Sequence, residues 1–257
     1  MKQHISIIKI GTQVLTTPDG QLNLNLLRAL TYDVARYIKD SRSPVIIVSS
    51  GAVTSGAEFL NITPQCIPEE QAAAAVGQIL LMQEYSHFFK SNGHKIAQIL
   101  LTRDAFDDPQ KALNTKNTLL TLLDNDIIPI INENDTVSTE EIKFGDNDQL
   151  SSLTAILIGA KQLLMLTDTD GVFTADPNVH SDAELIEVIP DIQSFDIDQF
   201  ASGPMSKKSR GGMKSKLNAA KLASAHGTQV IIANGKRPDV VFNGLQGKTV
   251  GTLIHGG

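Results

Sequence analysis

Two lysines stand where their charge could act on a phosphate or another anion. Lys9 interrupts an otherwise apolar segment two residues before Gly11, so its ammonium group either extends into water or contacts an anion. A basic segment surrounds Gly211-Gly212 in a chain whose formal net charge is −6. Its cations are Lys207, Lys208, Arg210, Lys214 and Lys216. Lys214 and Lys216 fall in the first turn of a predicted helix, where the helix dipole disfavours cations. Either a solvated basic face or a bound polyphosphate would explain them.

Acidic and amide side chains concentrate in two neighbouring segments, Asn132-Glu133-Asn134-Asp135 and Gly145-Asp146-Asn147-Asp148. The residues between them, Thr136–Phe144, are predicted to form a short strand-like excursion. A hairpin with Asx turns would explain this composition without any ligand. Alternatively, the oxygens would suit the ammonium group of a small molecule, and the carboxylates could position a lysine through ion pairs.

Small residues follow a second apolar segment as Ser49-Ser50-Gly51-Ala52. Glycine would let backbone N–H groups approach an anion at the start of a helix, although a plain strand-to-helix turn has the same composition. Neither G-x-x-x-x-G-K-[ST] nor G-x-G-x-x-G occurs, which excludes the P-loop and dinucleotide fingerprints. The missing G-x-S-x-G disfavours a nucleophilic serine. The six histidines lack metal-site spacing, so no zinc site is predicted.

The elements that must position these residues alternate between strands and helices. Strands are predicted at 5–10, 44–48, 95–101, 127–131, 162–166 and 229–233, and helices at 22–39, 69–89, 111–123, 149–159 and 213–226. Such alternation favours a mostly parallel sheet with helices on both faces. Ligands bind such sheets beyond the carboxyl ends of the strands. This edge would gather Lys9, Ser50, Asn134 and Thr167 with their neighbours.

Composition narrows the class of protein. A chain of 257 residues can bury one large core, and no linker or repeat marks a second domain. The net charge of −6 argues against chain-wide attraction to nucleic acid or to an anionic membrane. One cysteine, Cys66, excludes an internal disulfide and suits a reducing compartment. Since no apolar segment reaches about 18 residues, we expect a cytoplasmic protein.

In this order the polar segments resemble the glutamate 5-kinase branch of the amino-acid kinase family. The matching motifs are Lys9-Ile10-Gly11-Thr12, Val48-Ser49-Ser50-Gly51-Ala52, Pro129–Asp135, Gly145–Asp148, Leu166–Gly171 and Gly211–Lys216. The resemblance implies a three-layer αβα sandwich with a mostly parallel open sheet. It also implies ATP-dependent phosphorylation of the side-chain carboxylate of L-glutamate to L-glutamyl 5-phosphate, the first step of proline biosynthesis. One kinase domain would span 1–257, with glutamate bound mainly by 1–160 and the nucleotide mainly by 161–257.

The resemblance also assigns roles to residues. Lys9 and Lys216 would reach the transferring phosphoryl group from opposite sides, and Asp148 would orient both lysines. The residues implied for glutamate binding are Ser50, Gly51, Ala52, Asn134, Asp135 and Asn147. Those implied for the nucleotide are Lys9, Gly11, Thr167, Asp168, Arg210, Gly211, Gly212, Met213 and Lys216. No protein metal site is implied, and Mg²⁺ is expected as the companion of ATP. The segment 202–212 is a candidate lid.

Further expectations come from the same resemblance. Proline would act as feedback inhibitor, and the protein would form a homo-oligomer, either a dimer or a tetramer. Many relatives carry a C-terminal PUA domain, whereas this chain is expected to be a kinase domain alone. Relatives commonly have Gly-Thr where this chain has Ser209-Arg210.

Two alternatives stay open at this point. Kinases for uridylate, acetylglutamate, aspartate or carbamate share the lysine and glycine plan, but the amide-rich region 132–148 favours a substrate with an ammonium group. A non-catalytic sensor of the same fold would need neither Lys9 nor Lys216.

Overall fold

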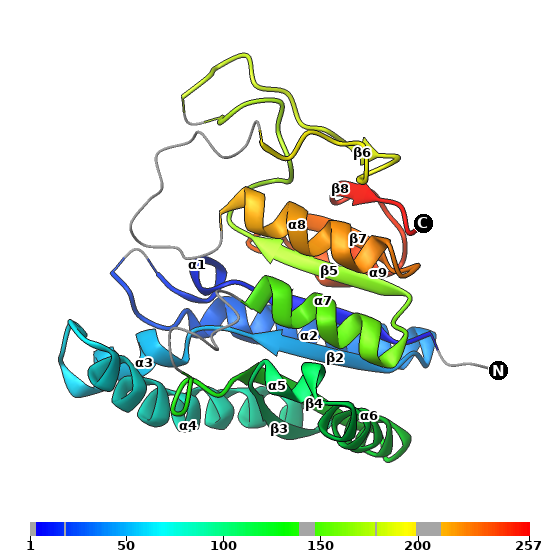
Figure 1. Ribbon diagram of the computed structural model, residues 1–257. Helices are drawn as coiled ribbons and strands as arrows, with labels where there is room; N and C mark the ends of the chain where they lie inside the picture. Colours follow the sequence, from blue (N-terminus) through cyan, green and yellow to red (C-terminus); the bar gives the residue numbers. More distant parts are fainter. Residues whose placement is uncertain (1–3, 18, 139–146, 178, 199–211) are drawn as a thin grey trace.

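The computed structural model describes residues 4–17, 19–138, 147–177, 179–198 and 212–257, and these residues build one eight-stranded sheet (Figure 1). The strand order is β3-β4-β2-β1-β5-β7-β8-β6. The strands are β1 (Ser6–Ile10), β2 (Val45–Ser49), β3 (Lys95–Leu101), β4 (Ile127–Glu133), β5 (Gln162–Thr167), β6 (Val188–Ile189), β7 (Gln229–Asn234) and β8 (Gly251–Ile254). Neighbouring strands pair in parallel except β7 with β8. The predicted mostly parallel sheet is confirmed.

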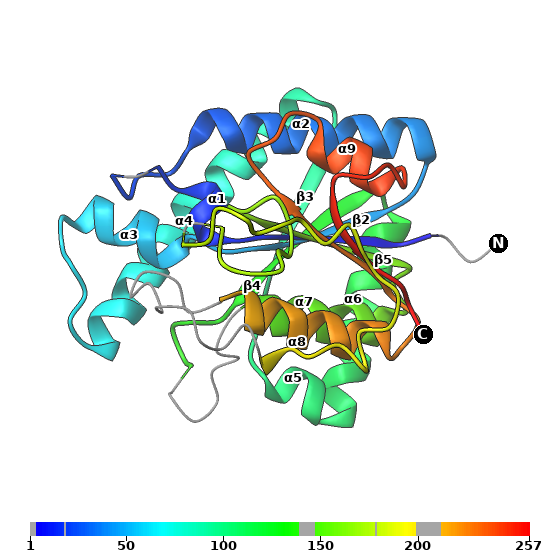
Figure 2. The ribbon, with the colours of Figure 1, turned by 90° about the horizontal axis from the view of Figure 1, so that it is seen from above.

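Helices cover both faces of this sheet, which makes a three-layer sandwich (Figure 2). The helices are α1 (Thr12–Leu15), α2 (Leu24–Ser41), α3 (Ala52–Leu60), α4 (Ile67–Ser91), α5 (Asp104–Asp107), α6 (Pro109–Asp124), α7 (Asn147–Ile158), α8 (Met213–Ser224) and α9 (Val240–Leu245). Apolar side chains of α1, α2, α4 and α9 share one core with the sheet, and those of α5, α6, α7 and α8 share the other. Helix α3 packs against α4.

Side chains of β1 alternate between these two cores. Ile7 belongs to the core under α7 and α8, whereas Ile8 and Ile10 belong to the core under α2 and α9. Because the strand repeats every two residues, Lys9 points to the same face as Ile7. Both faces of β1 are buried, which explains why a charged residue stands out in its sequence.

The sheet has its topological switch point between β1 and β5, because the chain adds strands on one side of β1 first and on the other side afterwards. Strands β1 to β4 lie on one side of this point and β5 to β8 lie on the other. In open parallel sheets, such a switch point leaves a crevice outside the carboxyl ends of the two central strands. The first of these strands carries Lys9, and the second ends at Thr167.

Helices α3 and α4 approach each other with almost no side chains between them. A Cβ atom added at Gly77 would lie 1.8 Å from the carbonyl oxygen of Ala52, and one added at Gly56 would lie 1.8 Å from that of Ala73. Real Cβ atoms do not approach carbonyl oxygens so closely, so only glycine permits this packing. Ala52 is the first residue of α3, so α4 holds the start of α3 directly.

The predicted strands and helices are all present, with ends shifted by a few residues. No bounds were predicted for α3, which was expected only as a helix that starts near Ala52. The elements that were not predicted at all, α1, α5, α9, β6 and β8, are too short for periodicity to reveal. The predicted strand-like excursion 136–144 is wrong where it can be compared. Thr136 and Val137 lie in a turn, because Val137 and Ser138 both donate backbone N–H bonds to the oxygen of Asn134. The remainder, 139–144, lies outside the described residues.

Candidate active site

Three charged side chains form a buried cluster where β1 meets α7 and α8. The Nζ atom of Lys9 lies 2.5 Å from Oδ1 of Asp148, and Nζ of Lys216 lies 3.2 Å from Oδ2. Asp148 has no exposed surface, and the two lysines are 4% and 6% exposed. One carboxylate therefore orients two ammonium groups. With two positive charges and one negative charge, the cluster has a formal net charge of +1.

Each member of the cluster comes from the end of a different element. Lys9 reaches the cluster from β1, on the face that α7 and α8 cover. Asp148 lies in the first turn of α7, where the helix dipole stabilises a carboxylate. Lys216 lies in the first turn of α8, where the dipole opposes a cation, and the ion pair with Asp148 offsets that penalty. The predicted placement of Lys214 and Lys216 in the first turn is confirmed.

The charge state of Asp148 follows from its surroundings. Burial alone would raise the pKa of this carboxyl, but attraction to Lys9 and Lys216 outweighs the cost and holds the pKa below its usual value. The carboxylate therefore stays ionised at neutral pH. A carboxylate whose pKa is lowered is a weak base, and its two ion pairs suit it to orienting the lysines.

Backbone groups of the loop after β2 come close to this cluster. Gly51 adopts the left-handed conformation, with φ at 100°, and caps the start of α3. The backbone N–H of Ser50 donates to the oxygen of Ile10, at 3.2 Å, which ties the loop to the end of β1. Gly51 and Ala52 are buried and Ser50 is half-buried. The arrangement places the N-terminus of α3 at the carboxyl edge of the sheet, where it can attract a negatively charged group.

The side chain of Asn147 joins this loop to the end of β4. Its Nδ2 atom lies 2.7 Å from the backbone oxygen of Ser49, 2.9 Å from Oγ of Ser50 and 2.9 Å from Oδ1 of Asn132. Asn147 directly precedes Asp148 at the start of α7. The glutamate-site residues predicted on β2 and α7 are therefore brought together, although they are 97 positions apart.

Asn134 and Asp135 follow β4 at the same edge, and both are half-buried. The backbone N–H of Asn134 donates to the oxygen of Leu101, at 2.9 Å, which extends the pairing of β4 with β3. The hydroxyl of Thr136 donates to Oδ1 of Asn134 at 2.6 Å. The bond is local, as expected for the turn that the sequence left open, but its donor is the hydroxyl of Thr136 and not a backbone N–H as in an Asx turn.

Of the residues predicted for the nucleotide, Lys9 and Gly11 lie on the β1 side of the switch point, whereas Thr167 and Asp168 lie on the β5 side. A Cβ atom at Gly11 would lie 3.5 Å from Nζ of Lys9, so glycine keeps this approach to the lysine open. Thr167 is buried at the end of β5, and its hydroxyl donates to Oδ1 of the exposed Asp168 at 3.2 Å. Gly212 caps α8, which starts at Met213. Arg210, Gly211 and most of the candidate lid 202–212 lie outside the described residues.

Sequence reasoning missed a polar group at the end of β7. Asn234 Nδ2 donates to Oδ1 of Asp170 at 2.9 Å, and Arg237 pairs with Oδ2 of the same carboxylate at 2.5 Å. The backbone N–H of Gly235 also donates to the oxygen of Thr167, at 2.8 Å. These bonds fasten the loop after β7 to the loop after β5. Asn234 ends a predicted central strand, so the rule of carboxyl ends could have found it.

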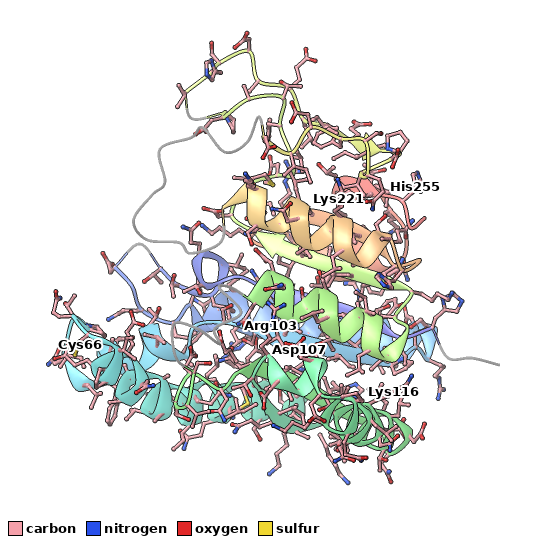
Figure 3. All side chains as sticks on the ribbon, viewed as in Figure 1. Cys66, Arg103, Asp107, Lys116, Lys221 and His255 are labelled. Carbon is pink, nitrogen blue, oxygen red and sulfur yellow. The ribbon has the colours of Figure 1, made fainter. Side chains whose placement is uncertain are left out.

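Other groups lie away from the lysine–aspartate cluster. Cys66 is exposed at the connection between α3 and α4, and His255 follows β8 (Figure 3). Within the described ranges, no group of three or more His, Cys, Asp or Glu residues could hold a metal ion. No helix of the described chain is long and apolar enough to cross a membrane.

The sequence of this chain is similar to that of known enzymes. The profile of the "Amino acid kinase family" matches residues 4–234. A curated "Glutamate 5-kinase" of Enterococcus faecalis is 43% identical over 258 residues, which cover 98% of this chain and 94% of that protein. The "Glutamate 5-kinase" of Geobacter sulfurreducens is 46% identical over 96% of this chain and 66% of its own length. That of Caldanaerobacter subterraneus is 43% identical, with 96% and 67% covered.

Solved structures share the fold at low sequence identity. An isopentenyl phosphate kinase superposes with a TM-score of 0.67 at 18% identity, covering 98% of this chain and all of that one. The UMP kinase of Ureaplasma parvum superposes with a TM-score of 0.66 at 14% identity, covering 99% of this chain and all of its own. These likenesses concern the arrangement of sheet and helices.

Proposed function

Because this chain belongs to the amino acid kinase family and is similar over nearly its whole length to curated glutamate 5-kinases, we propose that it phosphorylates L-glutamate. ATP donates its γ-phosphoryl group to the side-chain carboxylate, and the product is L-glutamyl 5-phosphate. This is the first step of proline biosynthesis. The observation that carries the proposal is the Lys9–Asp148–Lys216 cluster at the switch point of the sheet.

The cluster suits phosphoryl transfer because its charge is positive, fixed and shielded from water. The phosphoryl group gathers negative charge on its oxygens in the transition state, and fixed cations stabilise that charge. Lys9 and Lys216 approach one carboxylate from different elements, so their ammonium groups can contact a phosphoryl group from two sides. Loss of one such preorganised donor costs about 3 kcal/mol in the activation barrier.

No general base is required for this reaction. The acceptor is a carboxylate, which is already ionised at pH 7. Asp148 is itself held ionised by the two lysines, and its role is to aim them. Glutamate attacks the γ-phosphorus in line, the bond between that phosphorus and the β,γ-bridging oxygen breaks, and ADP leaves. Catalysis then consists of positioning and charge stabilisation.

Glutamate is bound by the loop after β2 and by the acidic and amide residues of β4 and α7. The N-terminus of α3, at Gly51 and Ala52, offers backbone N–H groups for a carboxylate. Asn147 turns its nitrogen towards Ser49 and Ser50, which leaves its carbonyl oxygen to accept from the ammonium group of glutamate. Asp135 supplies a negative charge for the same ammonium group.

The nucleotide is bound on the other side of the switch point, mainly by 161–257, and glutamate mainly by 1–160. Thr167, Asp168, Gly212 and Met213 belong to this nucleotide half, together with Arg210 and Gly211. Gly11 leaves room for phosphate oxygens next to Lys9. Mg²⁺ enters as part of the substrate MgATP and neutralises phosphate charge. Feedback inhibition by proline, assembly into a homo-oligomer and location in the cytoplasm stay predictions of the resemblance.

The direct test is trapping of the acyl phosphate. Purified protein is incubated with MgATP, L-glutamate and hydroxylamine, and the hydroxamate is measured alongside reactions with aspartate, N-acetylglutamate, UMP or no acceptor. The proposal expects hydroxamate with glutamate and little with aspartate or without an acceptor. Lys216→Met should lower the rate of hydroxamate formation about 100-fold or more. Lys221→Met is the matched control, because Lys221 lies on the same helix and donates only to the backbone oxygen of Gln193 among the bonds described for it.

Other outcomes would correct the proposal in different ways. Consumption of ATP with another acceptor, but not with glutamate, would retain the roles of Lys9 and Lys216 and overturn the substrate. Binding of ATP without turnover of any acceptor would indicate a sensor that kept the fold.

A further inference from the structure

A row of hydrogen-bonded amide side chains, buried at Gln78 and Asn132, connects α4 to the proposed glutamate site. Asn132 Nδ2 donates to Oε1 of Gln78 at 2.9 Å, and Asn132 Oδ1 accepts from Asn147 Nδ2 at 2.9 Å. At the far end, Gln78 Nε2 lies 3.4 Å from Oε1 of Gln98, on the edge strand β3. Asn132 is 2% exposed and Gln78 is 7% exposed. Asn147 is half-buried and Gln98 is exposed. Water is therefore a poor substitute only for the bond between the two buried members, Asn132 and Gln78.

The donors and acceptors in this row of amides determine which way each amide group faces. Oδ1 of Asn132 also accepts the backbone N–H of Glu133 at 2.9 Å, so its oxygen side is used by two donors. Its nitrogen side then needs an acceptor, and in the described part of the chain Oε1 of Gln78 is the acceptor it has. A buried amide nitrogen that lacks an acceptor destabilises its conformation by about 1–3 kcal/mol. Without Gln78, the side chain of Asn132 would therefore favour another orientation.

The orientation of Asn132 matters because Asn147 depends on it. Asn147 Nδ2 shares its two hydrogens among three acceptor oxygens, and Asn132 Oδ1 is the one on the side of β4. With its hydrogens directed at these oxygens, the nitrogen of Asn147 faces Ser49, Ser50 and Asn132, and its carbonyl oxygen faces away from them. An oxygen in that position accepts from an ammonium group, whereas a tilted or turned amide would present a donor and repel it.

We propose that Gln78 is a positioning residue that holds Asn132, and through it Asn147, so that Asn147 presents its carbonyl oxygen to the ammonium group of the substrate. Gln78 does not touch the substrate. It determines selectivity for an amino acid over a dicarboxylate of the same length that lacks the amino group. This inference rests on the proposed function.

The test compares glutamate with glutarate, which has both carboxylates and no ammonium group. Gln78→Met keeps the length of the side chain and removes both of its polar atoms. It should raise the KM for glutamate about tenfold, the effect of about one hydrogen bond, while leaving the inhibition constant of glutarate within about twofold of wild type. Leu81→Ala is the control, because Leu81 is fully buried on the same helix in the apolar core. It should lower the melting temperature without changing the ratio of the two constants.

A double-mutant cycle gives a second measurement that does not depend on glutarate. In an Asn147→Ala background, Gln78→Met should raise the KM for glutamate by less than about twofold, because the group that Gln78 positions is already gone. Equal weakening of glutamate and glutarate, or a full tenfold effect in the Asn147→Ala background, would overturn the inference. Absence of glutamate phosphorylation by the wild-type protein would instead overturn the proposed function, and this inference with it.

Discussion

Replacing Asp148 with asparagine should damage both stability and turnover. The substitution keeps the size of the side chain and removes the charge that pairs with Lys9 at 2.5 Å and Lys216 at 3.2 Å. Two buried ammonium groups then face each other without a carboxylate. Breaking a buried ion pair from one side costs about 3–5 kcal/mol. For a domain of this size, that corresponds to a fall in melting temperature of roughly 6–20 °C.

The assay is thermal unfolding followed by circular dichroism, at neutral pH and low salt, with and without ATP. The phosphates of ATP supply negative charge to the lysines, so ATP should raise the melting temperature of the variant more than that of wild type. Turnover should fall about 100-fold even at saturating substrates, because the lysines are no longer aimed. Asp198→Asn is the matched control, since Asp198 pairs with Lys214 at 2.8 Å on the surface. Its melting temperature should stay close to that of wild type.

The dependence on pH sharpens this test. The folded-state pKa of Asp148 lies below its usual value because the pull of the two lysines exceeds the cost of burial. Its contribution is therefore complete above the unfolded pKa of about 3.9 and is lost as the pH falls towards the folded pKa. The gap between wild type and Asp148→Asn should be constant near neutral pH and should close below about pH 4. A melting temperature within about 2 °C of wild type would refute the ion-pair reasoning. Full turnover by Asp148→Asn would refute it as well.

Three further predictions concern other contacts. Lys216→Met should lower kcat about 100-fold or more while leaving the KM for glutamate nearly unchanged, which hydroxamate rates over a range of glutamate would measure; a loss confined to KM would contradict a role in the transition state. Gly77→Ala should lower the melting temperature and raise the KM for glutamate, because its Cβ would lie 1.8 Å from the oxygen of Ala52 and force α3 away from α4. Asp33→Asn should be more stable than wild type at pH 7–8, with the difference vanishing below about pH 4. Burial raises the pKa of Asp33, so the stability of wild type falls as the pH rises from the unfolded pKa through the folded pKa. Melting curves of wild type and Asp33→Asn over a series of pH values would measure this difference.

Much of the sheet follows from the sequence alone. The inner strands are continuous apolar runs because both of their faces are buried, and Lys9 was conspicuous for the same reason. The rule of carboxyl ends then gathered the polar segments at one edge without any knowledge of packing. Short elements such as β6 and β8 escaped because a few residues carry no periodic signal, and β8 alone makes the antiparallel pairing with β7.

The sequence did not reveal which side chains of the site contact one another. Lys9 and Asp148 are 139 positions apart, and Asp148 and Lys216 are 68 apart, so nothing local indicates that they meet. Gln78 is still harder to foresee, since it is one of three glutamines in α4 and no pattern distinguishes it from the other two. The sequence determined which residue types each element presents and at which edge of the sheet. Only the tertiary structure decided which of those groups share one carboxylate or one amide, because that depends on how helices far apart in the chain pack across the sheet.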